Sequence, residues 1–228
     1  MNNLKRKRKK TLSPRLRYPL RKSISIVGLM GSGKTTIGVR LARRLNLTFV
    51  DSDHEIEAAA GHTVKEIFEK FGEDDFRKGE RRVINRLITQ DKKIVLGTGG
   101  GAFMDEKTRG RLKTKSLVIW LKVDVDMLVE RTSKRDTRPL LKTGNPRKIL
   151  QKLAEDRYPI YKEAHITVES GQGPHDKVVN DIIWKLNKYL AIEKKKYQNR
   201  MARQRAKMNN VQKQEKNNGT ASDTKDKG

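Results

Sequence analysis

Short apolar runs alternate along this chain with longer stretches in which apolar residues recur every three or four positions. The runs predict buried strands at residues 24–27, 47–50, 94–96, 116–121 and 166–168. Mainly apolar runs of this length are typical of strands that are covered on both faces. The longer stretches predict a helix that starts near residue 36 and others at about 63–71, 74–90, 124–132, 145–156 and 174–190.

Strands that alternate with helices in this way indicate an α/β domain. We expect a central parallel five-stranded sheet with helices on both faces, which makes three layers. In such sheets the ligand site lies beyond the carboxyl ends of the strands. The residues that follow the predicted strands are therefore the first candidates for function.

Three segments depart from the pattern. Residues 133–144 are polar and basic and contain Pro139 and Gly144, so we expect a mobile loop there and a lid over about 133–146. Residues 1–22 contain ten Lys or Arg and no acid, and residues 191–228 contain eleven against four acids. Both ends have too few apolar residues to form a core. We expect a domain over 23–190, a basic disordered tail before it, and after it a basic, mostly disordered tail with some helix near 191–208.

The formal net charge of the 228 residues is +26. Basic tails attract polyanions, RNA first, through salt-sensitive counterion release. The composition favours the plainer interpretation that they add solubility and weak nonspecific attraction. Cys is absent, which is compatible with a reducing cytosol, and the longest apolar stretch, at 117–121, is too short to span a bilayer. We expect a cytoplasmic monomer that does not bind membranes.

The stretch from Gly28 to Thr35 reads G-x-x-x-x-G-K-T and lies between a predicted strand and a predicted helix. In this context the motif is a P-loop, in which backbone N–H groups line one concavity at the positive end of the helix. Lys34 then reaches the β and γ phosphates of a nucleoside triphosphate, and the Thr35 hydroxyl ligates Mg²⁺. The alternative is an accidental glycine turn, which the flanking strand and helix argue against.

Two further predicted strands end in residues that suit chemistry. Asp51 takes the place where P-loop proteins keep the carboxylate that holds Mg²⁺, and Asp53 would reach past the metal toward an acceptor. The strand at 94–96 runs into Gly99-Gly100-Gly101, whose backbone can approach a bound molecule closely. The plainer interpretations are a helix cap and a flexible turn. We expect these segments and the P-loop to meet at one cleft.

Four arginines are candidates among many surface arginines. Arg77 precedes Glu80 by three residues, which suits either a ligand site or an intrahelical ion pair. Arg138 lies in the predicted lid, where a cation can close on phosphates. Arg157 can grip a carboxylate at two points. The pattern alone does not separate these roles from solvated surface, and the same holds for Arg131.

In their order and spacing these segments resemble the shikimate kinase family over about residues 23–190. The resemblance rests on Gly28 to Thr36, Asp51-Ser52-Asp53, Phe76-Arg77-x-x-Glu80, Gly99-Gly100-Gly101, Arg131 with Arg138-Pro139-Leu140-Leu141, and Arg157-x-x-x-Tyr161. Shikimate kinases transfer the γ-phosphate of ATP to the 3-hydroxyl of shikimate in aromatic amino-acid biosynthesis. The resemblance implies a P-loop kinase fold, ATP and Mg²⁺ as cofactors, and shikimate as substrate. Thr35 stands where Ser is commoner, which preserves the hydroxyl.

The resemblance also implies a role for each matching residue. Asp53 would orient or deprotonate the attacking hydroxyl, with Lys34 and Arg138 as further catalytic residues. The nucleotide would contact Gly28, Gly31, Ser32, Gly33, Lys34, Thr35, Thr36, Arg131, Arg138 and Pro174. Shikimate would contact Asp53, Arg77, Glu80, Gly99, Gly100, Gly101 and Arg157, with Arg77 and Arg157 on its carboxylate. Mg²⁺ would be held by Thr35 and, through water, by Asp51.

Other functions fit parts of the pattern. A gluconate-type or nucleoside-monophosphate kinase shares the phosphate cradle and a lid, but Asp53, Arg77 and Arg157 argue against its acceptor site. A nucleic-acid-associated protein with a vestigial or regulatory P-loop would work through the tails. In a third arrangement the tails only localise an ordinary kinase on anionic surfaces. The four histidines are scattered without ligand spacing, so the sequence implies no metal besides Mg²⁺.

Overall fold

The computed structural model describes residues 14–133 and 144–222, and the central part of the predicted lid, with Arg138, lies outside the described residues. Five parallel strands form one sheet: β1 (Ser23–Val27), β2 (Thr48–Asp51), β3 (Ile94–Gly97), β4 (Ser116–Lys122) and β5 (Ile166–Glu169). Their order is β2-β3-β1-β4-β5. Ile24 in the central strand lies opposite Val95 on one side and Leu117 on the other. The predicted parallel five-stranded sheet is confirmed.

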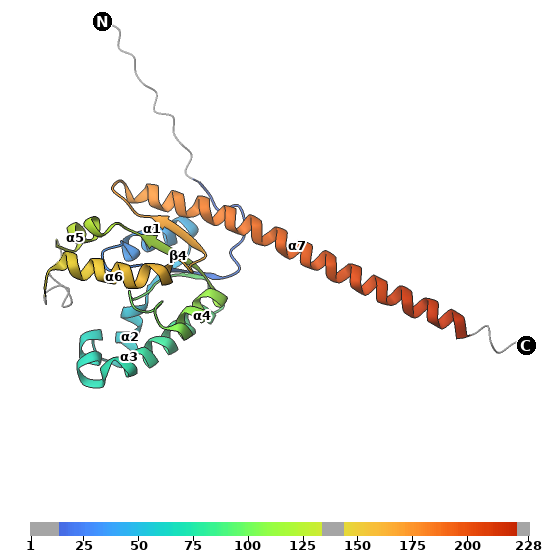
Figure 1. The fold of residues 1–228 in the computed structure, drawn as a ribbon, viewed down its shortest axis with the longest axis horizontal. Helices are drawn as coiled ribbons and strands as arrows, with labels where there is room; N and C mark the ends of the chain where they lie inside the picture. Colours follow the sequence, from blue (N-terminus) through green and yellow to red (C-terminus); the bar gives the residue numbers. More distant parts are fainter. Residues whose placement is uncertain (1–13, 134–143, 223–228) are drawn as a thin grey trace, which may run out of the picture. The chain divides into compact units, whose positions relative to one another are not determined.

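Helices cover both faces of this sheet (Figure 1). They are α1 (Lys34–Leu45), α2 (Ser52–Ala60), α3 (Val64–Thr89), α4 (Glu106–Lys115), α5 (Val125–Ser133), α6 (Pro146–Tyr161) and α7 (His175–Ser222). Successive strand residues face opposite sides. On one side Val27 and Trp120 belong to a core with Ile84 of α3 and Leu150 of α6. Ile26 faces the other side, where α1 packs, and is fully buried.

The sequence pattern does not predict α2 or α4, because each of these helices has few apolar residues on its buried side. In α2 the only large apolar residue that is buried is Ile56, and in α4 it is Leu112. What starts both helices is a side-chain cap: Asp51 accepts from the N–H of Asp53, and Asp105 accepts from the N–H of Thr108. Capping can define a helix that periodicity alone does not reveal.

Two predicted helix boundaries differ from the structure. The helix predicted to end near Asp156 continues through Pro159 to Tyr161. Pro159 removes one hydrogen bond of the helix, and the full burial of Tyr161 offsets that loss. The helices predicted at 63–71 and 74–90 form one element, α3, with a break at Gly72 (φ 79°). A capping box formed by Thr63 and Glu66 starts α3.

The chain forms two compact units, residues 1–185 and 186–228, and α7 runs through both. In the first unit, α7 buries Val178, Val179, Ile182 and Ile183. In the second, the helix continues to Ser222, whereas the sequence predicts helix only near 191–208 in a mostly disordered segment. The stretch is rich in Lys, Arg, Gln, Ala and Met, which are good helix formers, so an established helix can propagate along it. No described helix is both long and apolar enough to cross a membrane.

Candidate active site

The loop that joins β1 to α1 forms the phosphate cradle. Three of its glycines, Gly28, Gly31 and Gly33, have positive φ angles, which lets the backbone curl. Lys34 opens α1, and its ammonium donates hydrogen bonds to the carbonyls of Gly28 (2.9 Å) and Leu29 (3.0 Å). The lysine therefore lies across the loop, where the phosphates of a nucleotide bind in P-loops.

Thr35 and Asp51 lie side by side next to this cradle. The Thr35 hydroxyl donates to Oδ2 of Asp51 at 3.3 Å, and Oδ1 of the same carboxylate accepts from the N–H of Asp53 at 3.1 Å. Mg²⁺ prefers hard oxygen ligands and commonly uses one or two protein oxygens together with phosphate and water. The two side chains fit that ligand set.

A buried serine joins β2 to the glycine loop after β3. Ser52 is fully buried, and its hydroxyl accepts from the N–H of Gly99 (3.0 Å) and donates to Oδ1 of Asp53 (3.4 Å). Burial raises the pKa of Asp53 and the charge of Asp51 raises it further, whereas Lys34 lowers it. Asp53 is thus a partly buried carboxylate within the field of Lys34, suited to accept a hydrogen bond or a proton from a hydroxyl.

Glu80 supplies a second carboxylate. Its side chain is 1 % exposed, and Oε2 accepts from Nη1 of Arg77 at 2.7 Å. Oε1 is buried and accepts no hydrogen bond from the described residues, and it lies near Gly99. Burial raises the pKa of Glu80, and Arg77 opposes that shift. A buried acceptor of this kind is a place where a ligand hydroxyl can donate.

The third side of the cleft comes from α6. Arg157 and Tyr161 lie one turn apart and both donate to the carbonyl of Gly100, at 3.0 and 2.5 Å. Burial raises the pKa of Tyr161 to about 12, so its hydroxyl stays protonated at neutral pH. A Cβ atom built on Gly100 would lie 3.7 Å from the carbonyl oxygen of Gly28, which shows that this loop abuts the phosphate cradle.

The structure brings most of the predicted site residues together. Asp53 lies against Gly99, Arg157 bonds to Gly100, and Arg77 lies against Gly101. Arg131 is elsewhere: it donates to the carbonyls of Ser170 (3.3 Å) and Gly171 (2.9 Å), in the loop that leads to Pro174. Arg138 lies outside the described residues.

Two residues that shape the cleft received no role from the sequence. Ser52 lies between Asp51 and Asp53, and its sequence signal is a small hydroxyl residue directly after a strand. Tyr161 follows Arg157 by four residues, and this spacing places both on one helix face only because α6 extends past Asp156.

A phosphate cradle after the central strand, next to a pocket of arginines and carboxylates, defines a P-loop kinase that acts on a small molecule. A family model described as "Shikimate kinase" matches residues 30–187. The chain belongs to the shikimate kinase family, and its reaction is the ATP-dependent phosphorylation of the 3-hydroxyl of shikimate, a step of aromatic amino-acid biosynthesis. The predicted family, fold and activity are confirmed.

Individual relatives agree with this assignment. Shikimate kinase of Paramagnetospirillum magneticum is 49% identical over 183 residues, which cover 80% of this chain and 93% of the relative. Shikimate kinase of Zymomonas mobilis is 51% identical over 174 residues, or 76% of this chain and 97% of the relative. The structure of shikimate kinase from Acinetobacter baumannii in complex with shikimate is 42% identical, with a TM-score of 0.66, and covers 76% of this chain and 94% of that one.

The rival gluconate-type kinase shares the fold alone. A gluconokinase from Sinorhizobium meliloti aligns with a TM-score of 0.52 at 18% identity. A nucleic-acid-associated protein with a vestigial P-loop is set aside by the family assignment.

Proposed function

We propose that the glycine loop Gly99–Gly101 is the floor of the shikimate pocket and that three segments arrange the substrate above it. The observation that carries this proposal is the convergence on that loop of Asp53 from α2, Arg77 from α3 and Arg157 from α6. A small cyclic acid with several hydroxyls needs guanidinium groups for its carboxylate and oxygen acceptors for its hydroxyls. The loop has both kinds of group around it.

Arg77 and Arg157 bind the carboxylate, and Glu80 accepts from a ring hydroxyl through Oε1. Asp53 orients the 3-hydroxyl toward the γ-phosphorus. As the new O–P bond forms, the hydroxyl proton passes to Asp53 and the bond from the γ-phosphorus to the bridging oxygen of ADP breaks. Because this transition state is largely dissociative, positioning and charge neutralisation matter more than the strength of the base.

Lys34 and the N–H groups from Gly28 to Gly33, with Thr36, hold the phosphates. Thr35 and, through water, Asp51 hold Mg²⁺, which neutralises phosphate charge when it is bound. Arg138 in the lid reaches the transferred phosphate, and Arg131 and Pro174 lie on either side of the adenine. The roles of Arg131 and Pro174 are supported by the hydrogen bond from Arg131 to the loop that precedes Pro174.

A coupled ADP-release assay tests the acceptor. Shikimate, gluconate and nucleoside monophosphates are offered separately with ATP and Mg²⁺, and we expect turnover with shikimate only. The same assay with EDTA in place of Mg²⁺ should show no turnover. Comparable rates with gluconate would contradict the arrangement of the pocket.

We further propose that the enzyme is a cytoplasmic monomer and that its basic tails make weak contacts with polyanions, RNA first. Support for the polyanion contact is the excess of Lys and Arg in residues 1–22 and 191–228. Light scattering coupled to size-exclusion chromatography measures the oligomeric state, and a dimer at micromolar concentration would contradict the monomer.

A further inference from the structure

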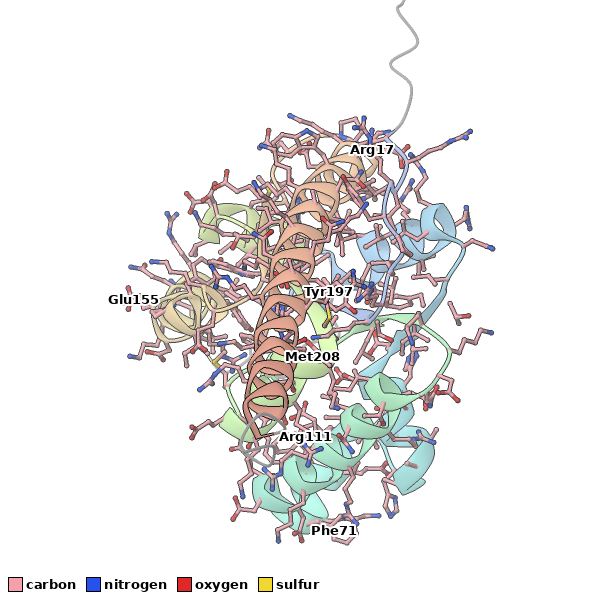
Figure 2. All side chains as sticks on the ribbon, turned by 90° about the vertical axis from the view of Figure 1, so that its right-hand side faces the viewer. Arg17, Phe71, Arg111, Glu155, Tyr197 and Met208 are labelled. Carbon is pink, nitrogen blue, oxygen red and sulfur yellow. The ribbon has the colours of Figure 1, made fainter. Side chains whose placement is uncertain are left out.

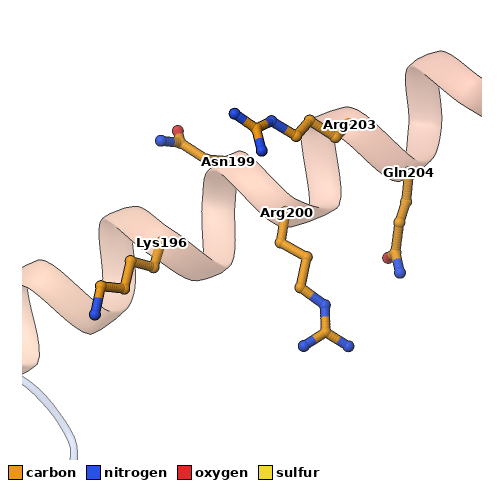
Figure 3. A pocket seen from close by; sticks show the side chains of 5 residues that line it. All are labelled: Lys196, Asn199, Arg200, Arg203 and Gln204. Carbon is orange, nitrogen blue, oxygen red and sulfur yellow. The ribbon is translucent and has the colours of Figure 1, made fainter.

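The part of α7 beyond residue 190 carries two short rows of polar side chains. Lys196, Arg200 and Gln204 are spaced by four residues, and Asn199 and Arg203 form a parallel row with the same spacing. Residues four apart lie on the same helix face. Figure 3 shows the two rows on neighbouring flanks of the helix, and together they line a hollow of about 510 Å³. We call these five residues the α7 stripe.

Acidic groups do little to neutralise the stripe. Glu193 is the only acid between residues 190 and 214, and it pairs with Lys196 at 3.0 Å. Both side chains of this ion pair are exposed, Lys196 by 70% and Glu193 by 45%. Water and salt therefore weaken the pair. The guanidinium groups of Arg200 and Arg203 therefore add positive charge without an acid on the same stretch of helix. Such a surface fits an anionic partner.

The apolar side chains of this segment are too dispersed for a membrane surface. Ile192, Tyr197 and Met208 are 56%, 47% and 64% exposed, and Figure 2 labels the last two. Tyr197 and Met208 are eleven residues apart and lie on one side of the helix with Met201, whereas Ile192 lies on another side. This narrow row is not the broad apolar face with which interfacial helices enter lipid. Electrostatic attraction to phosphates is the stronger feature.

We propose that the α7 stripe is a binding surface for single-stranded RNA, which rests on and refines the polyanion contact proposed above. Lys196 and Arg203 are seven residues apart, or about 10 Å along the axis, which is about the length of three stacked nucleotides. Arginine binds phosphate through two parallel hydrogen bonds. The amides of Asn199 and Gln204 offer both donors and acceptors, which suits the 2′-hydroxyl of RNA. A flexible single strand can follow one helix, whereas a rigid duplex presents fixed phosphates.

The test uses the full-length protein and fluorescence anisotropy of a labelled mixed-sequence RNA of about twenty nucleotides. The stripe variant combines Lys196→Gln, Arg200→Gln and Arg203→Gln. Its matched control combines Lys194→Gln, Lys195→Gln and Arg205→Gln, which remove the same charge from other sides of the same helix. Circular dichroism and shikimate kinase activity should be the same in both variants and the parent.

Binding is measured from 50 to 200 mM KCl. Three phosphate contacts contribute about 2 to the slope of log affinity against log salt, or a roughly twentyfold fall over this range. We expect the stripe variant to lose that contribution and the control to keep most of it. An equal loss in both variants would overturn the stripe while leaving the polyanion contact intact. No RNA binding by the parent at 50 mM KCl would overturn both. If the parent bound single-stranded DNA of the same sequence, or phosphatidylserine vesicles, more tightly than the RNA, the proposal that RNA is the ligand would be wrong.

Discussion

Two glycines of one loop, Gly99 and Gly101, allow the acceptor pocket to be perturbed without unfolding the protein. A Cβ atom on Gly101 would lie 2.6 Å from Nη2 of Arg77, and one on Gly99 would lie 2.7 Å from Oδ1 of Asp53. Ordinary contacts begin near 3.4 Å, so each side chain must move by roughly 0.7 to 0.8 Å. Both are flexible ends of side chains and can move, so the fold should survive Gly101→Ala and Gly99→Ala while the pocket geometry changes.

The two substitutions should affect different kinetic constants. Gly101→Ala displaces the guanidinium that we assign to the shikimate carboxylate. Loss of one charge-assisted hydrogen bond costs about 1.5–3 kcal/mol, so KM for shikimate should rise about 10- to 150-fold. Gly99→Ala displaces Asp53, so kcat should fall by up to about 100-fold, as expected for a misplacement approaching 1 Å. KM for ATP should change little in either variant.

Steady-state kinetics with each substrate varied in turn, and the melting temperature, measure these effects. Gly110→Ala is the matched control, because a Cβ atom at Gly110 in α4 would meet nothing within 4 Å. This control should keep its kinetics and gain a little helix stability, about 1 kcal/mol at most. If Gly101→Ala left both KM for shikimate and kcat unchanged, Arg77 would not face the bound substrate and the pocket assignment would be wrong.

Three other substitutions test single residues. Asp53→Asn should abolish turnover while nucleotide still binds in a calorimetric titration. Because burial raises the pKa of Asp53 in the folded protein, its ionised form is destabilising at neutral pH, and the same variant should melt at a higher temperature; a lower melting temperature would contradict this. Arg157→Lys should raise KM for shikimate far more than KM for ATP, since an ammonium cannot replace a two-point fork, and equal losses would indicate general misfolding. The pKa of Tyr161 is about 12 when folded and about 10 when unfolded. Between pH 10 and 12 the free energy of unfolding of the parent should therefore fall by up to about 2.7 kcal/mol more than that of Tyr161→Phe. Urea denaturation measures both free energies. If they changed with pH in parallel, the ionisation of Tyr161 would not contribute to stability.

The sequence was sufficient for the sheet because its strands are short, mainly apolar runs. Three of them, β1, β3 and β4, are buried along almost their whole length, whereas the edge strand β2, predicted to be buried, is only half-buried. Ile24 and Ile119, for example, are fully buried. It was also sufficient for the P-loop, because that motif depends on local backbone geometry. Strand order and the meeting of Arg77 with Gly101 could not be derived from spacing, because they depend on how distant segments pack.

The parts that the sequence missed have a common cause. In α2 and α4 capping carboxylates start the helix and few apolar residues follow, so periodicity is weak. The predicted helix ends near Asp156, before Arg157 and Tyr161, so the sequence does not predict that α6 places both side chains on one face. The role of Ser52 depends on a hydrogen bond to Gly99, forty-seven residues away, and no local pattern reports such a bond.

Gly100 stands between two binding sites, since its carbonyl bonds to Arg157 while its backbone abuts Gly28 of the phosphate cradle. A nucleotide that adjusts the cradle will shift this shared wall and so alter the pocket for the acid. By thermodynamic linkage, each substrate must then change the dissociation constant of the other by the same factor. Each ligand should therefore change the affinity of the other, and a substitution at Gly100 should weaken that coupling.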